Sequence, residues 1–201
     1  MRMWPPNARL RAARRLLRLA VAALSLSACG SAPRESFDLS GGAHASAARA
    51  AVGHAGAALA VNEPETSPAL HPERIVIRIA PGEIAYLADA QWADRLTRLV
   101  QARLVSAFGR GGVAATLPGA PVAAALSTII HRFEIDLTRQ TAVVEIAARI
   151  LDDKTGRDRA ARVFRGEAPA PHTYGAAAVQ SLEAALDDAS RQLVGWARGR
   201  I

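Results

Sequence analysis

The stretch Ile129-Ile-His-Arg-Phe-Glu-Ile-Asp-Leu137 decides the fold, because from Ile129 onward apolar and polar residues alternate. Successive side chains of a β-strand point to opposite faces, so this stretch predicts a strand with one buried face. The predicted inward set is Ile129, His131, Phe133, Ile135 and Leu137, and the outward set is Arg132, Glu134, Asp136 and Thr138. Such an alternation is typical of antiparallel sheets. In this register we expect His131 to be an ordinary core histidine.

Two further strands follow closely. A turn is predicted at residues 138–141. The inward-facing residues of the strand that follows are predicted to be Val144, Ile146, Ala148 and Ile150. The sequence Asp152-Asp-Lys-Thr-Gly156 predicts a solvated hairpin turn, because glycine readily adopts a positive φ. The returning strand is expected over residues 157–168, before Pro169. Earlier strands are expected at 59–61, 74–79, 84–87 and 113–117.

Two amphipathic helices complete the predicted domain. Asp89 is expected to cap a helix over residues 90–108, and Thr173 a helix from Tyr174 to Trp196. The second helix has the clearest helical periodicity of the chain, with apolar residues at Leu182, Leu186, Ala189, Leu193 and Trp196. Helices on one face of a mixed, mostly antiparallel sheet form a two-layer sandwich. The sequence therefore predicts an α+β domain over residues 59–201.

The N-terminal segment has the pattern of a secretory signal peptide. Residues 1–28 contain six arginines and no acidic residue, and the apolar run Leu19–Ala28 is too short to span a bilayer. The run ends in Leu26-Ser-Ala-Cys29, which resembles a bacterial lipobox. That resemblance implies cleavage between Ala28 and Cys29 and lipidation of Cys29, whose thiol is a readily alkylated nucleophile. The alternative is an uncleaved anchor helix followed by an ordinary buried thiol.

The segment 29–58 is predicted to be a lipidated, flexible linker. Its second half is almost entirely Ala, Gly, Ser, His and Arg, and such a composition buries too little apolar surface to offset its ordering entropy. His44 and His54 are read as spacer residues there. Removal of the signal takes six of the 25 basic residues, which leaves 19 against 18 acidic ones, so charge gives no support for nucleic-acid binding. Cys29 is the only cysteine, which excludes an intrachain disulfide.

The sequence shows little sign of catalysis. It contains no Gly-x-Ser-x-Gly elbow, phosphate-binding loop, His-Glu-x-x-His motif or paired-cysteine metal motif. Ser127 and His131 fall on one strand, too far apart for a catalytic pair. We therefore expect no catalytic residue, no metal site and no cofactor. Tyr86 and Trp92 are candidate contacts for a partner or a lipid, with ordinary core packing as the alternative.

The order of several short motifs resembles the ABC-type transport auxiliary lipoprotein family. After the lipobox, the motifs are Arg34…Phe37-Asp38-Leu39, Leu59-Ala-Val61…Pro64, Arg74-Ile-Val-Ile-Arg78, Tyr86…Trp92-Ala93, Phe133-Glu134 and a long helix that ends at Trp196. The family includes the lipoprotein of the paraquat-inducible operon. The chain departs from the family by its Ala/Gly/His-rich insertion and by Ile77, where the family usually has Tyr.

The resemblance implies a non-enzymatic component of an envelope system that transports lipids or other hydrophobic molecules. Its partners would be an MCE (mammalian cell entry) domain protein and the associated ABC permease and ATPase. Cys29 would carry diacylglycerol and an acyl chain such as palmitate. Gly30 agrees with anchoring in the outer membrane on its periplasmic face, because Asp at that position is the usual inner-membrane retention signal.

Three other functions stay open at this stage. The chain could be a structural or assembly lipoprotein that supports outer-membrane protein or polysaccharide export. It could be a cryptic hydrolase or isomerase, which would need a pocket of convergent polar groups. It could also carry lipid directly, which would need an apolar groove between sheet and helices.

Overall fold

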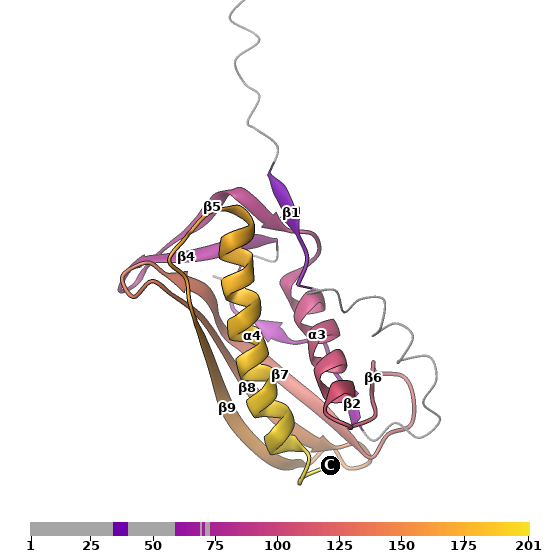
Figure 1. Ribbon diagram of the computed structural model, residues 1–201. Coiled ribbons are helices and arrows are strands. Elements are labelled where there is room, and N and C mark those ends of the chain that lie inside the picture. The colour runs from indigo at the N-terminus through magenta and orange to yellow at the C-terminus, as the bar shows by residue number, and fades with distance from the viewer. Residues whose placement is uncertain (1–33, 40–58, 69, 71–72) are drawn as a thin grey trace, which may run out of the picture. The chain divides into compact units, whose positions relative to one another are not determined.

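The computed structural model describes residues 34–39, 59–68, 70 and 73–201. Strands and helices follow one another in the order β1 (Glu35–Phe37), β2 (Leu59–Val61), β3 (Glu65–Thr66), β4 (Arg74–Ala80), β5 (Glu83–Trp92), α3 (Leu96–Arg110), β6 (Ala115–Thr116), β7 (Ala124–Asp136), β8 (Thr141–Asp152), β9 (Asp158–Pro169) and α4 (Gly175–Ala197). Within these residues the strands form one mixed sheet, and both helices lie in front of it in Figure 1. The predicted α+β architecture is thereby confirmed.

Strand β7 is the centre of the sheet. Along one edge it pairs with β8 in antiparallel register over its whole length, and β8 pairs with β9 in the same way. Along its other edge β7 pairs successively with β2, β3 and β4, all in parallel. Strand β5 pairs antiparallel to β4, and β1 adds in parallel to β5. The long pairings are thus antiparallel and most of the short ones are parallel.

The two helices bury one face of this sheet. Helix α4 packs on β8 and β9, and all five positions of its predicted apolar periodicity are buried. The closest approach is at Gly166 of β9, where an added Cβ would stand 2.6 Å from the backbone nitrogen of Ala189 and still closer to the carbonyl oxygen of Ala185. Strand β9 can lie this close to α4 only because residue 166 is a glycine.

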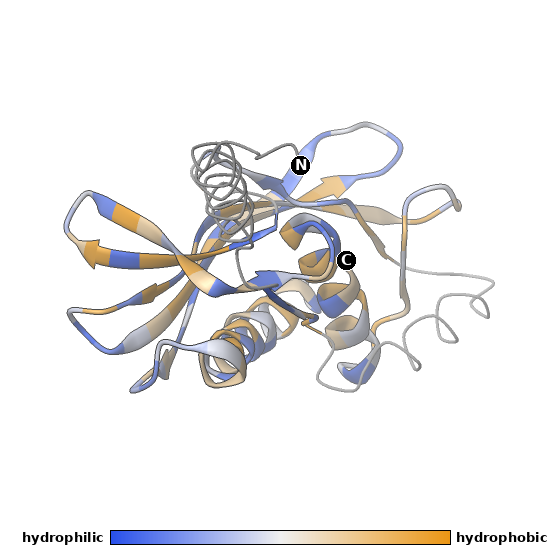
Figure 2. Ribbon diagram, turned by 90° about the horizontal axis from the view of Figure 1, so that it is seen from above, coloured by the Kyte–Doolittle hydropathy of each residue, from blue (hydrophilic) through white to orange (hydrophobic). Residues whose placement is uncertain are grey.

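A β-bulge corrects the predicted register of β7. The pairing with β8 shifts between Ile130 and Arg132, so the residues that face the helices change from even to odd positions there. Ile130 is fully buried, whereas His131 is exposed. The prediction of a core histidine was therefore wrong, while Phe133 and Ile135 are buried as predicted. Figure 2 shows the alternation of hydrophobic and hydrophilic residues along the strands.

The folded unit begins earlier than residue 59. Residues Glu35–Phe37, which the sequence analysis placed in the linker, form β1, and Leu39 is 1 % exposed. Phe37 pairs with Trp92 of β5, and its carbonyl oxygen accepts a hydrogen bond from the backbone nitrogen of Ala93 at 2.7 Å. Residues 30–34 therefore separate Cys29 from the sheet. The rest of the proposed linker, residues 40–58, connects β1 to β2 and lies outside the described residues.

The first helix also begins later than predicted. Asp89 lies within β5 and caps no helix, since α3 starts at Leu96. The segment is held as a strand by tertiary pairing: the backbone nitrogen of Trp92 donates to the carbonyl oxygen of Glu73 at 2.9 Å. Its pairing with β1 and β4 outweighs the weak helical propensity of its alanines.

Candidate functional site

The structure separates the two predicted contact residues. Tyr86 is partly exposed on the face of the sheet away from the helices, where the Arg74 guanidinium lies 5.0 Å from its ring centroid. Trp92 is 2 % exposed and packs edge-on against Phe133, with ring centroids 5.7 Å apart. A buried indole offers no surface to a partner or a lipid, so the contact role suggested for Trp92 was wrong. That role stays a prediction for Tyr86.

The other predicted features are distributed as follows. Ala28 and Cys29 lie outside the described residues, as do His44 and His54. The Asp152–Gly156 turn is present, with Gly156 at φ +67°. Hydrogen bonds from Arg159 and Thr155 hold the pKa of Asp152 well below its usual range. Asp152 therefore serves the hairpin itself, as predicted.

An ionic cluster that the sequence analysis did not predict lies on the face of the sheet away from the helices. Glu134 is 1 % exposed, although the alternation placed it on the polar face. Arg78 donates to both of its carboxylate oxygens at 2.7 and 2.8 Å, and Arg132 donates to Oε1 at 2.7 Å. The parallel pairing of β4 with β7 sets Arg78 beside this position. The cluster joins the two halves of the sheet through charge-assisted hydrogen bonds.

Burial and hydrogen bonding shift the pKa of Glu134 in opposite directions. Burial raises the pKa of its carboxyl group, but the hydrogen bonds from Arg78 and Arg132 outweigh it, and the net pKa lies below the usual value. The neighbouring Asp136 also has a lowered pKa, chiefly because the Thr138 hydroxyl donates to it. Both groups are therefore ionised at neutral pH. Every group in the cluster is thus paired, which suits a structural role better than a catalytic one.

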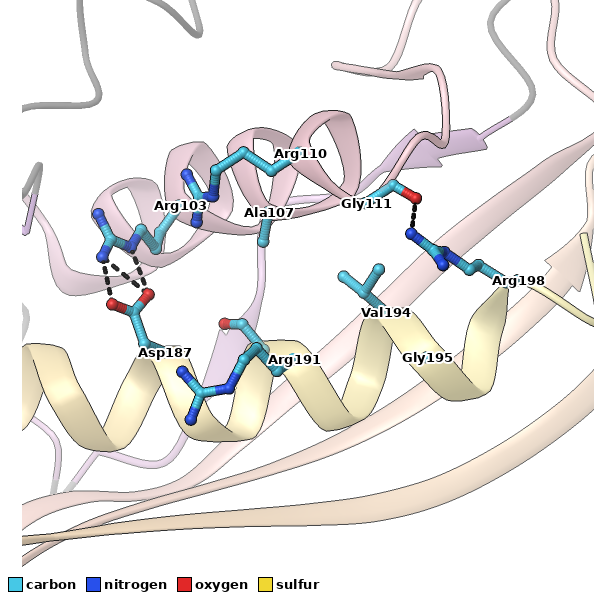
Figure 3. A pocket seen from close by; sticks show the side chains of 10 residues that line it. Arg103, Ala107, Arg110, Gly111, Asp187, Arg191, Val194, Gly195 and Arg198 are labelled. Carbon is cyan, nitrogen blue, oxygen red and sulfur yellow. Dashed lines mark hydrogen bonds and ion pairs between the residues drawn. The ribbon is translucent and has the colours of Figure 1, made fainter.

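A groove of about 590 Å³ lies between α3 and α4, and charged side chains from both helices converge on it. We call it the arginine groove; its walls are Arg103, Ala107, Arg110 and Gly111 of the α3 side and Asp187, Ser190, Arg191, Val194, Gly195 and Arg198 of the α4 side. Figure 3 shows arginines from both walls around it. Four guanidinium groups line it against the single carboxylate of Asp187.

The arginine groove is fixed in shape by two contacts. At one end Arg103, 8 % exposed, holds Asp187 through both carboxylate oxygens, each 2.7 Å from Nη2. At the other end Nη2 of Arg198 donates to the carbonyl oxygen of Gly111 at the end of α3. An added Cβ on Gly111 would meet the side chain of Val194 at 2.5 Å, so the end of α3 lies directly against α4 there. Between these contacts the groove is open.

The arginine groove was not predicted from the sequence, although the spacing of its arginines is a signal for it. Arg103 and Arg110 are seven residues apart on α3, and Arg191 and Arg198 are seven residues apart on α4. Residues two helical turns apart share one face, so each helix presents two arginines on one side. Neither pair reveals that the two faces meet, because that depends on how the helices pack on the sheet.

The described residues contain no group of three or more His, Cys, Asp or Glu side chains placed to hold a metal ion. Among the same residues, neither helix has both the length and the apolarity needed to cross a bilayer.

Comparison with known proteins identifies the family. The sequence model described as "ABC-type transport auxiliary lipoprotein component" matches residues 37–194, so the chain belongs to that family, as its motif order predicted. The matched region begins in β1 and ends in α4, and thus includes nearly all of the described domain.

Individual proteins resemble the chain in sequence or in fold. The uncharacterized protein bll6063 of Bradyrhizobium diazoefficiens is 34% identical over 146 residues, which are 70% of this chain and 39% of that protein. The chain thus spans about two-fifths of the length of this relative. The crystal structure of protein XCC0632 from Xanthomonas campestris is 30% identical with a TM-score of 0.64, and the match covers 71% of this chain and 84% of that one. A second solved structure, of an uncharacterized protein, is 14% identical with a TM-score of 0.60 and shares the fold; 70% of this chain and 91% of that one are covered.

Proposed function

We propose that this chain is a periplasmic lipoprotein, anchored in the outer membrane through Cys29, that acts as the non-catalytic auxiliary component of an MCE-type ABC transport system. The observation that carries the proposal is the lipobox-like Leu26-Ser-Ala-Cys29 directly before a domain of the auxiliary lipoprotein family. A diacylglycerol on Cys29 supplies two acyl chains, enough for stable membrane anchoring. The cargo of the system would be phospholipid or another hydrophobic molecule.

The position of β1, which begins at Glu35, supports a short connection between the lipid anchor and the folded domain. If Cys29 carries the lipid, only residues 30–34 connect it to β1, and an extended chain of this length reaches roughly 20 Å. The domain would then be held close to the membrane surface, with a high local concentration for a partner that arrives there. This replaces the long tether that the sequence analysis expected.

The ionic cluster and the helix layer support a scaffold rather than an enzyme. The buried carboxylate of Glu134 is fully engaged by Arg78 and Arg132, and Asp136 by Thr138 and Arg139. A catalytic acid or base would instead need a proton acceptor or donor facing substrate. We infer a domain whose surface binds partners while the transport energy comes from another chain.

Affinity purification of the intact lipoprotein from native envelopes, with mass spectrometry of the bound proteins, tests the partner. We expect an MCE-domain protein and its ABC permease. Recovery of an outer-membrane barrel or secretin without an MCE protein would overturn the transport role and favour an assembly lipoprotein.

Membrane fractionation tests the anchor separately. Cys29→Ala is expected to release the protein from the outer membrane, and Gly30→Asp is expected to move it to the inner membrane. The Gly30→Ala protein is the matched control and should stay in the outer membrane. A Cys29→Ala protein that remained membrane-bound and active would show that the anchor is not the Cys29 lipid.

A further inference from the structure

We propose that the arginine groove binds a phosphate group, with the hydroxyl of Ser190 as one of its hydrogen-bond donors. The phosphate is either free or part of a lipid headgroup, since both present the same oxyanion chemistry. The inference goes beyond the proposed function and does not depend on Cys29 or on any MCE partner.

The first observation is the surplus of donors in the groove. Each guanidinium has five N–H groups. Arg110 uses one on the Ser106 hydroxyl, Arg191 one on Asp188, and Arg198 one on the Gly111 carbonyl. These three side chains therefore keep most of their N–H groups for a ligand. Arginine is the side chain best suited to bind phosphate through paired N–H groups.

The second observation is the hydroxyl of Ser190. The residue is 1 % exposed and its Oγ has no hydrogen-bond partner among the described residues. A serine inside a helix usually donates to the carbonyl four residues earlier, as Ser181 of the same helix does to Ala177 at 3.2 Å. A buried polar group without a partner destabilises the fold. Ser190 lines the arginine groove, so an oxyanion there would supply the missing acceptor.

The third observation is the space. At Gly195 an added Cβ would meet no heavy atom within 4 Å, so the α4 wall is open at that position. The volume of about 590 Å³ is in the range of small-molecule sites and exceeds what a bare phosphate needs. The remainder can hold the glycerol part of a headgroup. Charge, an unsatisfied donor and room therefore coincide in one place.

Helix stabilisation is the competing explanation for these arginines. Arg110 and Arg198 lie at helix C-termini, where a positive charge is favourable. That role accounts neither for Arg191, which lies inside α4, nor for the unpaired hydroxyl of Ser190.

Isothermal titration calorimetry of the full chain in a non-ionic detergent, at constant ionic strength, tests the proposal with two probes. The probes are sodium phosphate and glycerophosphoglycerol, the soluble headgroup of phosphatidylglycerol. Binding of phosphate alone would assign free phosphate as the ligand. Binding of glycerophosphoglycerol would assign the headgroup. Binding of neither would overturn the proposal.

Two matched pairs of variants locate the binding. Gly195→Glu places a carboxylate in the open part of the groove and is expected to weaken binding about tenfold by repulsion, whereas Gly195→Gln adds the same bulk without charge and should weaken it much less. Ser190→Ala is expected to weaken binding roughly tenfold and to leave the melting temperature equal or higher. Ser181→Ala should leave binding unchanged. Equal affinities of Gly195→Glu and Gly195→Gln, or unchanged binding by Ser190→Ala, would refute the site.

Discussion

The close approach of β9 to α4 predicts a large loss of stability for Gly166→Ala. The new methyl group would stand 2.6 Å from the backbone nitrogen of Ala189, whereas ordinary contact begins at 3.4 Å. The two clashing atoms, the nitrogen of Ala189 and the carbonyl oxygen of Ala185, belong to the backbone of α4. No side-chain rotation can therefore relieve the overlap. The helix must therefore retreat from the sheet by about 0.8 Å or more, in an interior that is normally close-packed.

The magnitude follows from what that retreat separates. Overpacking a core costs typically about 1–3 kcal/mol, and a clash with two backbone atoms belongs at the upper end or above. Leu182, Leu186 and Leu193 of α4 are all fully buried and would lose part of their contact with β8 and β9. Replacing glycine by alanine also lowers the conformational entropy of the unfolded chain, and this offsets about 0.4–1 kcal/mol of the lost stability. We expect a net loss of about 3 kcal/mol, and for a domain of this size a melting temperature lower by roughly 6–12 °C.

Thermal unfolding of the purified protein, followed by far-ultraviolet circular dichroism, measures this loss. Gly195→Ala is the matched control, because it makes the same chemical change at an exposed helical position with open space around it. That variant is expected to gain up to about 1 kcal/mol. If Gly166→Ala melts within 2 °C of the parent protein, as roughly a 0.5 kcal/mol change would do, the inferred backbone contact between β9 and α4 is incorrect.

Two further substitutions test the sheet, each by equilibrium urea unfolding. Glu134→Gln removes the partner of Arg78 and is expected to cost about 2–3 kcal/mol at pH 7, less than a fully buried pair because Arg78 is 26% exposed. Because the pKa of Glu134 is lowered in the folded state, its contribution is complete above the unfolded value of 4.5 and is lost as the pH falls through the lower folded value. The variant should thus lose less stability than the parent below about pH 4.5, and parallel pH profiles would contradict this. Trp92→Ala is expected to cost about 3–5 kcal/mol through the cavity left beside Phe133, and a cost below about 1 kcal/mol would contradict the burial of the indole.

Much of the fold can be predicted from side-chain periodicity, because long elements repeat their pattern several times. Helix α4 and the strands β8 and β9 are of this kind. The bulge in β7 could not be found, since Ile129-Ile130 offers an apolar residue in either register. The short β1 could not be found either, because its three residues pair with Ala90–Trp92, more than fifty positions away.

The candidate sites were less predictable than the fold. Glu134 was read as a surface residue, because alternation alone cannot show that Arg78 of a distant parallel strand would cover it. The arginine groove depends on two helices that are separated in the sequence by four strands of the sheet. Side chains on one helix can be grouped by spacing, but only the packed structure shows which groups face each other.

The central place of β7 also has a consequence for the order in which the chain folds. The short strands β2 and β3 pair with β7 only when residues 124–136 are available, whereas β4 can pair earlier with β5 in an antiparallel hairpin. The meander β7–β8–β9 is instead joined by short turns, and local contacts of this kind form fastest. We expect the C-terminal half to form first and to serve as the template for the N-terminal strands. During synthesis, and during any passage across a membrane, β2 and β3 would therefore wait for this template, and the chain would depend on chaperones in that interval.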